Sequence, residues 1–92
     1  MTDLTMRITV PESVLFRDLD GEAVLLETGS GRYYGLDEVG TRMWSLIHLH
    51  GEIGAVCRAL LAEYDVPEGR LREDLERFVE TLAARGLVRM DG

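Results

Sequence analysis

The sequence predicts an α+β fold, in which a three-stranded antiparallel meander is followed by three helices. Up to residue 36, short apolar runs alternate with turn residues, which is typical of short strands joined by tight turns. From residue 37 onward, apolar residues recur at three- and four-residue spacing, as on the buried face of a helix. The chain has 92 residues, which suffice for one domain. We therefore treat residues 1–92 as a single domain, with residues 1–5 expected to form a disordered tail.

The strands of the predicted meander are joined by turns that contain glycine. Asp20-Gly21 is a hairpin signal, because glycine adopts a positive φ without a Cβ penalty, and Gly29-Ser30-Gly31 is a second tight connection. Two short turns in succession make consecutive strands antiparallel neighbours and leave the third strand at an outer edge. The three predicted strands are Val14–Phe16, Ala23–Leu26 and Arg32–Leu36.

The helices are predicted from three apolar stripes and from the residues at their ends. Asp37 is expected to cap the first helix and Gly51 to end it. Asp65 and Glu68 have the spacing of a capping box before the third helix, and Gly86 is its stop signal. The resulting order of elements is that of a winged helix-turn-helix-like domain. The stripes are Val39, Met43, Leu46 and Ile47; Ile53, Val56, Cys57, Leu60, Leu61 and Tyr64; and Leu71, Leu75, Phe78, Val79 and Leu82.

Two short apolar segments flank these elements. Ile8 and Val10 precede Pro11, which has no backbone N–H to donate, so this segment is expected at the edge or end of extended structure. Leu87-Val88 follows the third helix and is expected to close the core.

Charge excludes several classes of partner. The chain has ten Arg, no Lys and seventeen acidic residues, so its formal net charge is −7. Phosphate binding requires a surplus of cations, and we therefore expect neither nucleic acid nor an anionic membrane surface as a partner. No apolar run is long enough to cross a membrane, and Met1–Leu4 includes an acid where a secretion signal needs a cation. The protein is therefore expected to be cytoplasmic.

The residues that most often carry chemistry are predicted to have structural roles. Cys57, the single cysteine, lies within an apolar stripe and is expected to be a small core residue. His48 and His50 project from different sides of the end of a helix and lack the further ligands of a structural zinc site. Gly29-Ser30-Gly31 is followed by tyrosines and not by the helix and Lys of a phosphate loop. We expect no metal site, no cofactor and no enzymatic activity.

The predicted edge strand, Gly31–Leu36, indicates an activity. It contains no Pro and one charge, Arg32, although exposed edges are usually blunted by Pro, Lys or a covering element. Such an edge can accept a peptide as an added strand. Alternatively, a loop or a second copy of the chain covers it, and a homodimer through this edge would compete with a peptide. Tyr33 and Tyr34 point to opposite faces, so at most one lines a groove.

The chain resembles the PqqD-like family, named after the small protein of pyrroloquinoline quinone synthesis. The resemblance extends from Val10 to Val88 and is densest in Ser30–Trp44, where Gly-Arg-Tyr-Tyr-Gly-Leu-Asp is followed by Gly40 and Trp44. Many relatives have Asn where this chain has Asp37, an equally good helix cap. The second matching part comprises Leu60–Val66, Asp74, Phe78, Leu82 and Gly86-Leu87.

This resemblance implies a non-catalytic peptide chaperone. The family includes recognition elements for ribosomally made, post-translationally modified peptides, and this chain looks most like the stand-alone recognition proteins of lasso peptide pathways. The implied partners are the leader of a precursor peptide, a separate cysteine-protease-like leader peptidase and an ATP-dependent cyclase. The leader would pair with the third strand, in the cleft beside the third helix. The implied binding residues are Gly31, Arg32, Tyr33, Tyr34, Gly35, Leu36, Leu71, Asp74, Leu75, Arg77 and Phe78, of which Leu75 and Phe78 are also obvious core candidates.

Two other functions are compatible with the sequence. Within the same family, the chain could serve quinone cofactor synthesis, with the corresponding precursor peptide and a radical enzyme as partners. The order of elements alone would also fit a winged-helix DNA-binding regulator. Acids outnumber arginines on the third predicted helix, which argues against DNA as the partner.

Overall fold

The computed structural model describes residues 5–91, so the tail expected at residues 1–5 lies outside this range apart from Thr5. An antiparallel sheet is formed by β2 (Val14–Leu19), β3 (Glu22–Glu27) and β4 (Arg32–Gly35), in the order β2-β3-β4. Three helices follow this sheet along the chain. The predicted α+β fold, a three-stranded meander followed by three helices, is confirmed.

The first hairpin turn has the chemistry that the sequence predicts. Asp20 and Gly21 both have positive φ, at 57° and 86°. This combination matches the right-handed twist of the flanking strands. The Gly21 N–H also donates to the Asp18 carboxylate at 2.8 Å, which holds the turn closed.

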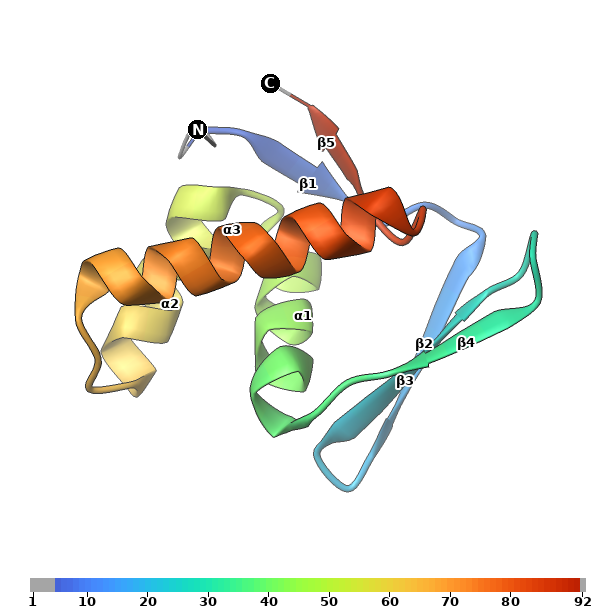
Figure 1. Ribbon diagram of the computed structural model, residues 1–92, viewed down its shortest axis with the longest axis horizontal. Coiled ribbons are helices and arrows are strands. Elements are labelled where there is room, and N and C mark those ends of the chain that lie inside the picture. The colour runs from blue at the N-terminus through green and yellow to red at the C-terminus, as the bar shows by residue number, and fades with distance from the viewer. Residues whose placement is uncertain (1–4, 92) are drawn as a thin grey trace.

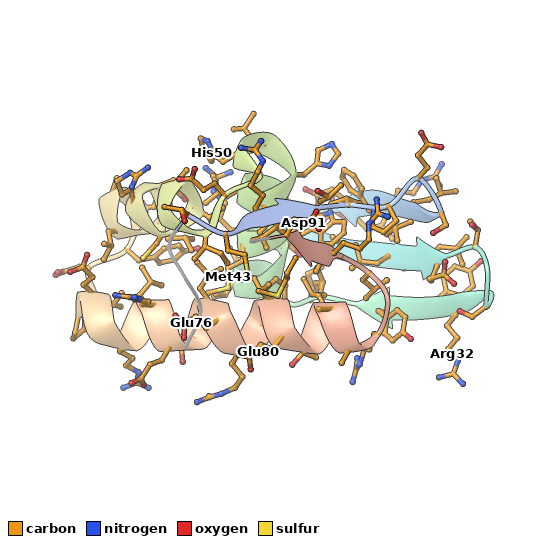
Figure 2. The ribbon with its side chains drawn as sticks, turned by 90° about the horizontal axis from the view of Figure 1, so that it is seen from above. Arg32, Met43, His50, Glu76, Glu80 and Asp91 are labelled. Atoms are coloured by element: carbon orange, nitrogen blue, oxygen red, sulfur yellow. The ribbon has the colours of Figure 1, made fainter. Side chains whose placement is uncertain are left out.

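The helices form the second part of the molecule. Figure 1 shows α3 (Glu68–Ala84) crossing in front of α1 (Glu38–His50) and α2 (Ile53–Glu63). Viewed from above in Figure 2, α3 and β4 lie on the same side of the molecule. The extents of the molecule are 36 × 32 × 18 Å, and the shortest axis is the one that runs vertically in Figure 2. One side of the molecule is therefore formed by β4 and α3 together.

The helix ends agree with the sequence predictions at both ends of α1 and at the end of α3, where Gly86 follows the C-cap with a φ of 73°, but the start of α3 differs. The Asp37 carboxylate accepts a hydrogen bond from the Gly40 N–H at 2.7 Å, and Gly51 ends α1 with a φ of 67°. The capping box predicted from Asp65 and Glu68 is wrong, because α3 begins at Glu68 with Pro67 as its N-cap and no side chain caps it. Asp65 lies too far ahead of this helix start to reach the amides of its first turn.

A second, smaller sheet joins the two ends of the described chain. β1 (Arg7–Thr9) and β5 (Arg89–Asp91) pair antiparallel, with Ile8 opposite Met90. The Ile8 N–H donates to the carbonyl oxygen of Gly51, which fixes this ribbon to the junction between α1 and α2. The sequence predicts an extended segment before Pro11 but not its pairing with the other end of the chain.

The core lies between the helices and the inner face of the sheet. Leu87 and Val88 are buried, so the prediction that this segment closes the core is confirmed. Phe16 packs edge-on against Trp44, with ring centroids 5.7 Å apart. The largest fully buried side chains are Trp44, Leu25, Ile47, Ile53, Leu60, Leu75, Leu87, Val56 and Val79.

Candidate functional site

One row of main-chain groups on β4 points away from the sheet. The Leu36 N–H donates to the Ala23 carbonyl oxygen of β3 at 2.8 Å. Hydrogen-bonded positions alternate along an antiparallel ladder, so Tyr34 also directs its N–H toward β3, whereas Tyr33 and Gly35 direct theirs outward. Within residues 5–91, no strand other than β3 pairs with β4. The predicted open edge is therefore present, and its outward groups belong to Tyr33 and Gly35.

The two tyrosines of β4 lie on opposite faces of the sheet. Tyr34 is half-buried on the side of the helices, and the Arg85 guanidinium lies over its ring, 5.2 Å from the centroid. Tyr33 is 70% exposed on the other face. Tyr34 thus contributes its side chain to the helix side of the edge, and Tyr33 contributes its main-chain groups.

A groove lies between the end of β4, the start of α1 and α3. We call it the β4–α3 groove; its volume is about 400 Å³. Gly40 leaves room for the Asp37 cap, since a Cβ at residue 40 would lie only 3.1 Å from Asp37 Oδ1, and Phe78 Cε1 would be in ordinary contact with that Cβ at 3.5 Å. The groove is lined by Gly35, Leu36, Asp37, Val39, Gly40, Met43, Asp74 and Phe78.

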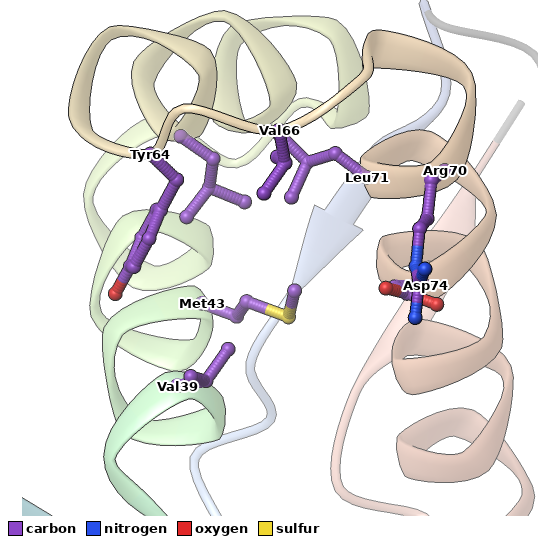
Figure 3. Close-up of a pocket in the computed structure, with 8 residues that line it drawn as sticks. Val39, Met43, Tyr64, Val66, Arg70, Leu71 and Asp74 are labelled. Atoms are coloured by element: carbon purple, nitrogen blue, oxygen red, sulfur yellow. The ribbon is translucent and has the colours of Figure 1, made fainter.

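A smaller, mainly apolar pocket adjoins this groove. It has a volume of about 170 Å³ and lies between α1, the α2–α3 connection and α3 (Figure 3). We call it the α1–α3 pocket. Val39, Met43 and Asp74 line both cavities, so the groove continues past the end of β4 into this pocket. The remaining lining residues are Leu60, Tyr64, Val66, Arg70 and Leu71.

The residues of α3 implied by the family resemblance fall in different environments. Asp74 lines both cavities, Phe78 lines the β4–α3 groove and Leu71 lines the α1–α3 pocket. Arg77 is exposed on α3. Leu75 is fully buried and lines neither cavity, so the structure places it in the core. The strand residues Gly31 to Leu36 lie together along the open edge and in the turn before it.

For several lining residues, the sequence predicts a role other than binding, or no role at all. Val39 belongs to the apolar stripe of the first helix, yet it is 47% exposed. Met43 belongs to the same stripe, and Asp37 is predicted only as a helix cap. Tyr64 and Val66 lie where α2 ends and the connection to α3 begins. Helical spacing identifies apolar residues but does not distinguish a groove wall from the core.

The turn before β4 is held by a carboxylate. Glu27 accepts hydrogen bonds from the N–H groups of Gly29 and Ser30, at 3.1 and 2.7 Å. The Gly29 amide, followed by that of Ser30, lowers the pKa of Glu27 below its ordinary value of 4.5. Gly31 follows with a φ of 70° and leads directly into β4.

The outer face of the sheet, on the side away from the helices, is apolar and is left uncovered by residues 5–91. Leu15 and Leu19 are 55% and 53% exposed, and Tyr33 lies on the same face. Together with Arg17, Val24 and Leu26, they line a shallow hollow of about 540 Å³, which Phe16 borders although its ring packs against Trp44 on the helix side. We call this surface the outer apolar face. It meets the open edge at Tyr33.

The groups with the greatest potential for catalysis or metal binding are not gathered at the groove. Cys57 is buried, and desolvation raises the pKa of its thiol. His48 and His50 are exposed at the end of α1. Among residues 5–91, no three His, Cys, Asp or Glu side chains are close enough together to hold a metal ion. No helix in the same range is both long and apolar enough to cross a membrane.

Comparisons with known proteins concern the family and the fold of this chain. The sequence profile of the family described as "Coenzyme PQQ synthesis protein D (PqqD)" matches residues 22–88. Among curated proteins, none matches this chain significantly.

Two solved structures resemble this one closely. The structure described as "TbiB1 in Complex with the TbiA(beta) Leader Peptide" is 34% identical in sequence, with a TM-score of 0.84 over 88% of this chain and 94% of that chain. "Lasso peptide synthetase B1 complexed with the leader peptide" is 20% identical, with a TM-score of 0.80 over 90% and 98% of the two chains. At 20% identity, the likeness to this second structure shows a shared fold.

Proposed function

Because this chain belongs to the PqqD family, we propose that it binds the leader segment of a ribosomally made precursor peptide and catalyses no reaction itself. The outward row of main-chain groups on β4, beside an open groove, is the observation that carries this proposal. A relative with 34% sequence identity was solved with a leader peptide, which supports the same class of ligand here.

The leader would bind as a fourth strand of the sheet. Its main-chain groups would pair with those of Tyr33 and Gly35, which need no rearrangement because β3 does not use them. The helix side of the added strand would face Phe78, Tyr34 and Arg85. Main-chain pairing accepts many sequences, so selectivity must come from side chains that enter the cavities.

Two cavities are suited to apolar side chains of the leader. Phe78 and Val39 provide apolar walls in the β4–α3 groove, and Met43, Val66 and Leu71 do so in the α1–α3 pocket. A volume of about 170 Å³ is of the size of a single large side chain. A few buried anchors usually dominate the affinity of such an interface. We therefore expect affinity to depend on one or two apolar leader residues.

Within this function, we propose a lasso peptide pathway. The bound leader would be presented to a separate leader peptidase and then to an ATP-dependent cyclase, without a cofactor in this protein. The segment Gly-Arg-Tyr-Tyr-Gly-Leu-Asp at residues 31–37 supports this assignment, because it resembles the recognition proteins of lasso peptide pathways. The outer apolar face adjoins Tyr33, so a processing enzyme that reads the bound leader would find apolar surface directly beside it.

The family description favours a second candidate, a PqqD-type chaperone in quinone cofactor synthesis. The neighbouring genes distinguish the two pathways. A transglutaminase-like protease and an asparagine-synthetase-like cyclase support the lasso pathway, and a radical enzyme supports the quinone pathway.

Calorimetric titration tests the proposed function. The probe is a synthetic leader of the precursor encoded beside this gene, and the control is a peptide of the same composition in shuffled order. We expect saturable, equimolar binding of the leader and none of the shuffled peptide. The absence of saturable binding would contradict the proposal. Sedimentation before and after leader addition checks the competing homodimer, which the leader should dissociate if both use β4.

A further inference from the structure

One end of the β4–α3 groove is acidic. Asp37 and Asp74 both line it, near the point where β4 ends at Gly35. Asp37 uses its Oδ1 atom to accept from the Gly40 N–H, and Asp74 is exposed. Within residues 5–91, neither carboxylate lies in an ion pair. Arg70 lines the α1–α3 pocket and not the groove.

The other end of the edge is basic. Arg85 follows α3 and holds its guanidinium over the ring of Tyr34, the residue before Gly35, so it lies between the two ends of β4. Arg32 is the first residue of β4, and Figure 2 shows its side chain extending from the far end of that strand. Glu27 is opposite Arg32 in the ladder, but its carboxylate is bonded to the Gly29 and Ser30 amides. Neither arginine has an ion-pair partner in the part of the chain that the structure describes.

The direction of a bound peptide decides which of its ends lies beside each of these charged groups. Antiparallel pairing is slightly more stable per residue than parallel pairing. An added strand antiparallel to β4 has its N-terminal part beside Gly35 and its C-terminal part beside Arg32. Its N-terminal part then lies at the acidic end of the groove, and its C-terminal part lies at the basic end.

We propose that the groove selects the charge pattern of its guest. In a guest that runs antiparallel to β4, a cationic side chain lies before the paired segment, beside Asp37 and Asp74, and an acidic side chain lies after it, beside Arg32. This inference rests on the proposed leader-binding function and specifies which leaders are accepted.

The expected size of this selection is moderate. Solvent-exposed ion pairs change an equilibrium by about two- to fivefold, and salt screens them. Reversing one charge turns an attraction into a repulsion, so about fivefold is expected for each reversal. The charges therefore set the choice among leaders, while main-chain pairing and apolar anchors supply most of the affinity.

Charge-swapped peptides test the proposal. Hydrogen exchange first identifies the paired segment of the neighbouring precursor's leader, and the residue just after that segment is then made Glu or Lys. At low salt the wild-type protein should bind the Glu peptide about fivefold more tightly, and Arg32→Glu should reverse this preference. Arg89→Glu is the matched control, because it makes the same charge change on β5. Equal binding of both peptides to the wild type, or the same preference in Arg32→Glu, would overturn the proposal.

The acidic end is tested in the same way. Two leader peptides are compared, one with Lys and one with Glu at the residue just before the paired segment. The wild-type protein should bind the Lys peptide more tightly, and Asp74→Lys should reverse this preference. Glu80→Lys is the matched control on α3, since Glu80 lines neither the β4–α3 groove nor the α1–α3 pocket. A preference that responds equally to Asp74→Lys and Glu80→Lys would show a general charge effect and would overturn the proposal.

Direction is measured independently by a nitroxide at either end of the leader. A label at the N-terminal end should broaden the amide signals of Leu36 and Asp74, and a label at the C-terminal end those of Gly31 and Arg32. The opposite pattern overturns the proposed direction while leaving leader binding intact. Failure of every leader to bind would instead contradict the proposed function.

Discussion

Glu27 has a direct effect on the binding edge although it lies outside the groove. Its carboxylate bonds to the amides of Gly29 and Ser30 and so fixes the turn from which β4 starts. These bonds require the charged form, which is why they lower the pKa of Glu27. The stabilisation is complete above the unfolded-state pKa and is lost as the pH falls through the lower folded-state pKa.

We predict that acid loosens this turn through Glu27. On titration from about pH 7 to pH 3, the amide resonances of Gly29 and Ser30 should shift together, with a midpoint below 4.5. Glu27→Gln keeps an oxygen acceptor but removes the titration, so these shifts should disappear, whereas Glu80→Gln should leave them unchanged. Unaltered shifts in Glu27→Gln would contradict the assignment.

At the scale of a single element, β4 has two sets of amides with different tasks. The amide of Tyr34 belongs to the ladder with β3, and that of Tyr33 belongs to the open edge. Proline has no N–H and is tolerated on the solvent side of an edge strand but not within a ladder. Proline substitution therefore separates the folding role of the strand from its binding role.

We predict that Tyr33→Pro folds but binds the leader about tenfold more weakly, since it removes one main-chain donor of about 1 kcal/mol and obstructs the guest. Tyr34→Pro should instead lower the free energy of unfolding by about 1–3 kcal/mol, because a ladder bond is lost. Urea unfolding and calorimetric titration measure the two effects. Tyr33→Ala, which keeps the N–H, is the control, and a loss of binding equal to that of Tyr33→Pro would show that the side chain matters instead.

At the scale of the whole molecule, α3 serves the core and the groove at once. Leu75 is fully buried, whereas Phe78, three residues later, is half-buried and lines the β4–α3 groove. Because α3 and β4 lie on the same side of the molecule, the helix that closes the core also forms one wall of the binding groove (Figure 2). Stability and binding should therefore depend on different residues of one helix.

We predict that Leu75→Ala lowers the free energy of unfolding by about 2–5 kcal/mol through the cavity it creates, with little change in the leader affinity of the folded protein. Phe78→Ala should weaken leader binding more than Leu75→Ala does, because it removes an apolar wall of the groove. Thermal unfolding with and without leader measures both, since a ligand of the folded state raises Tm. Equal effects of the two substitutions on affinity would contradict this separation of roles.

Much of the fold follows from local chemistry that the sequence displays. Asp20-Gly21 supplies the two positive φ angles of a hairpin turn, Asp37 caps α1 and Gly51 ends it. Such features depend on a few neighbouring residues, so they can be predicted without long-range contacts. The capping box was predicted by the same reasoning and is wrong, because Pro67 takes the N-cap position of α3.

The sequence by itself determined the order of strands and helices, the open third strand and the likeness to one family. Only the tertiary structure decided that β1 pairs with β5, that the outward amides are those of Tyr33 and Gly35, and that Phe78 and not Leu75 lines the groove. The physical reason is the sequence separation of the residues that interact. Turns and helix caps are set by residues a few positions apart. Strand register and the division between core and groove depend on contacts between segments distant in the chain.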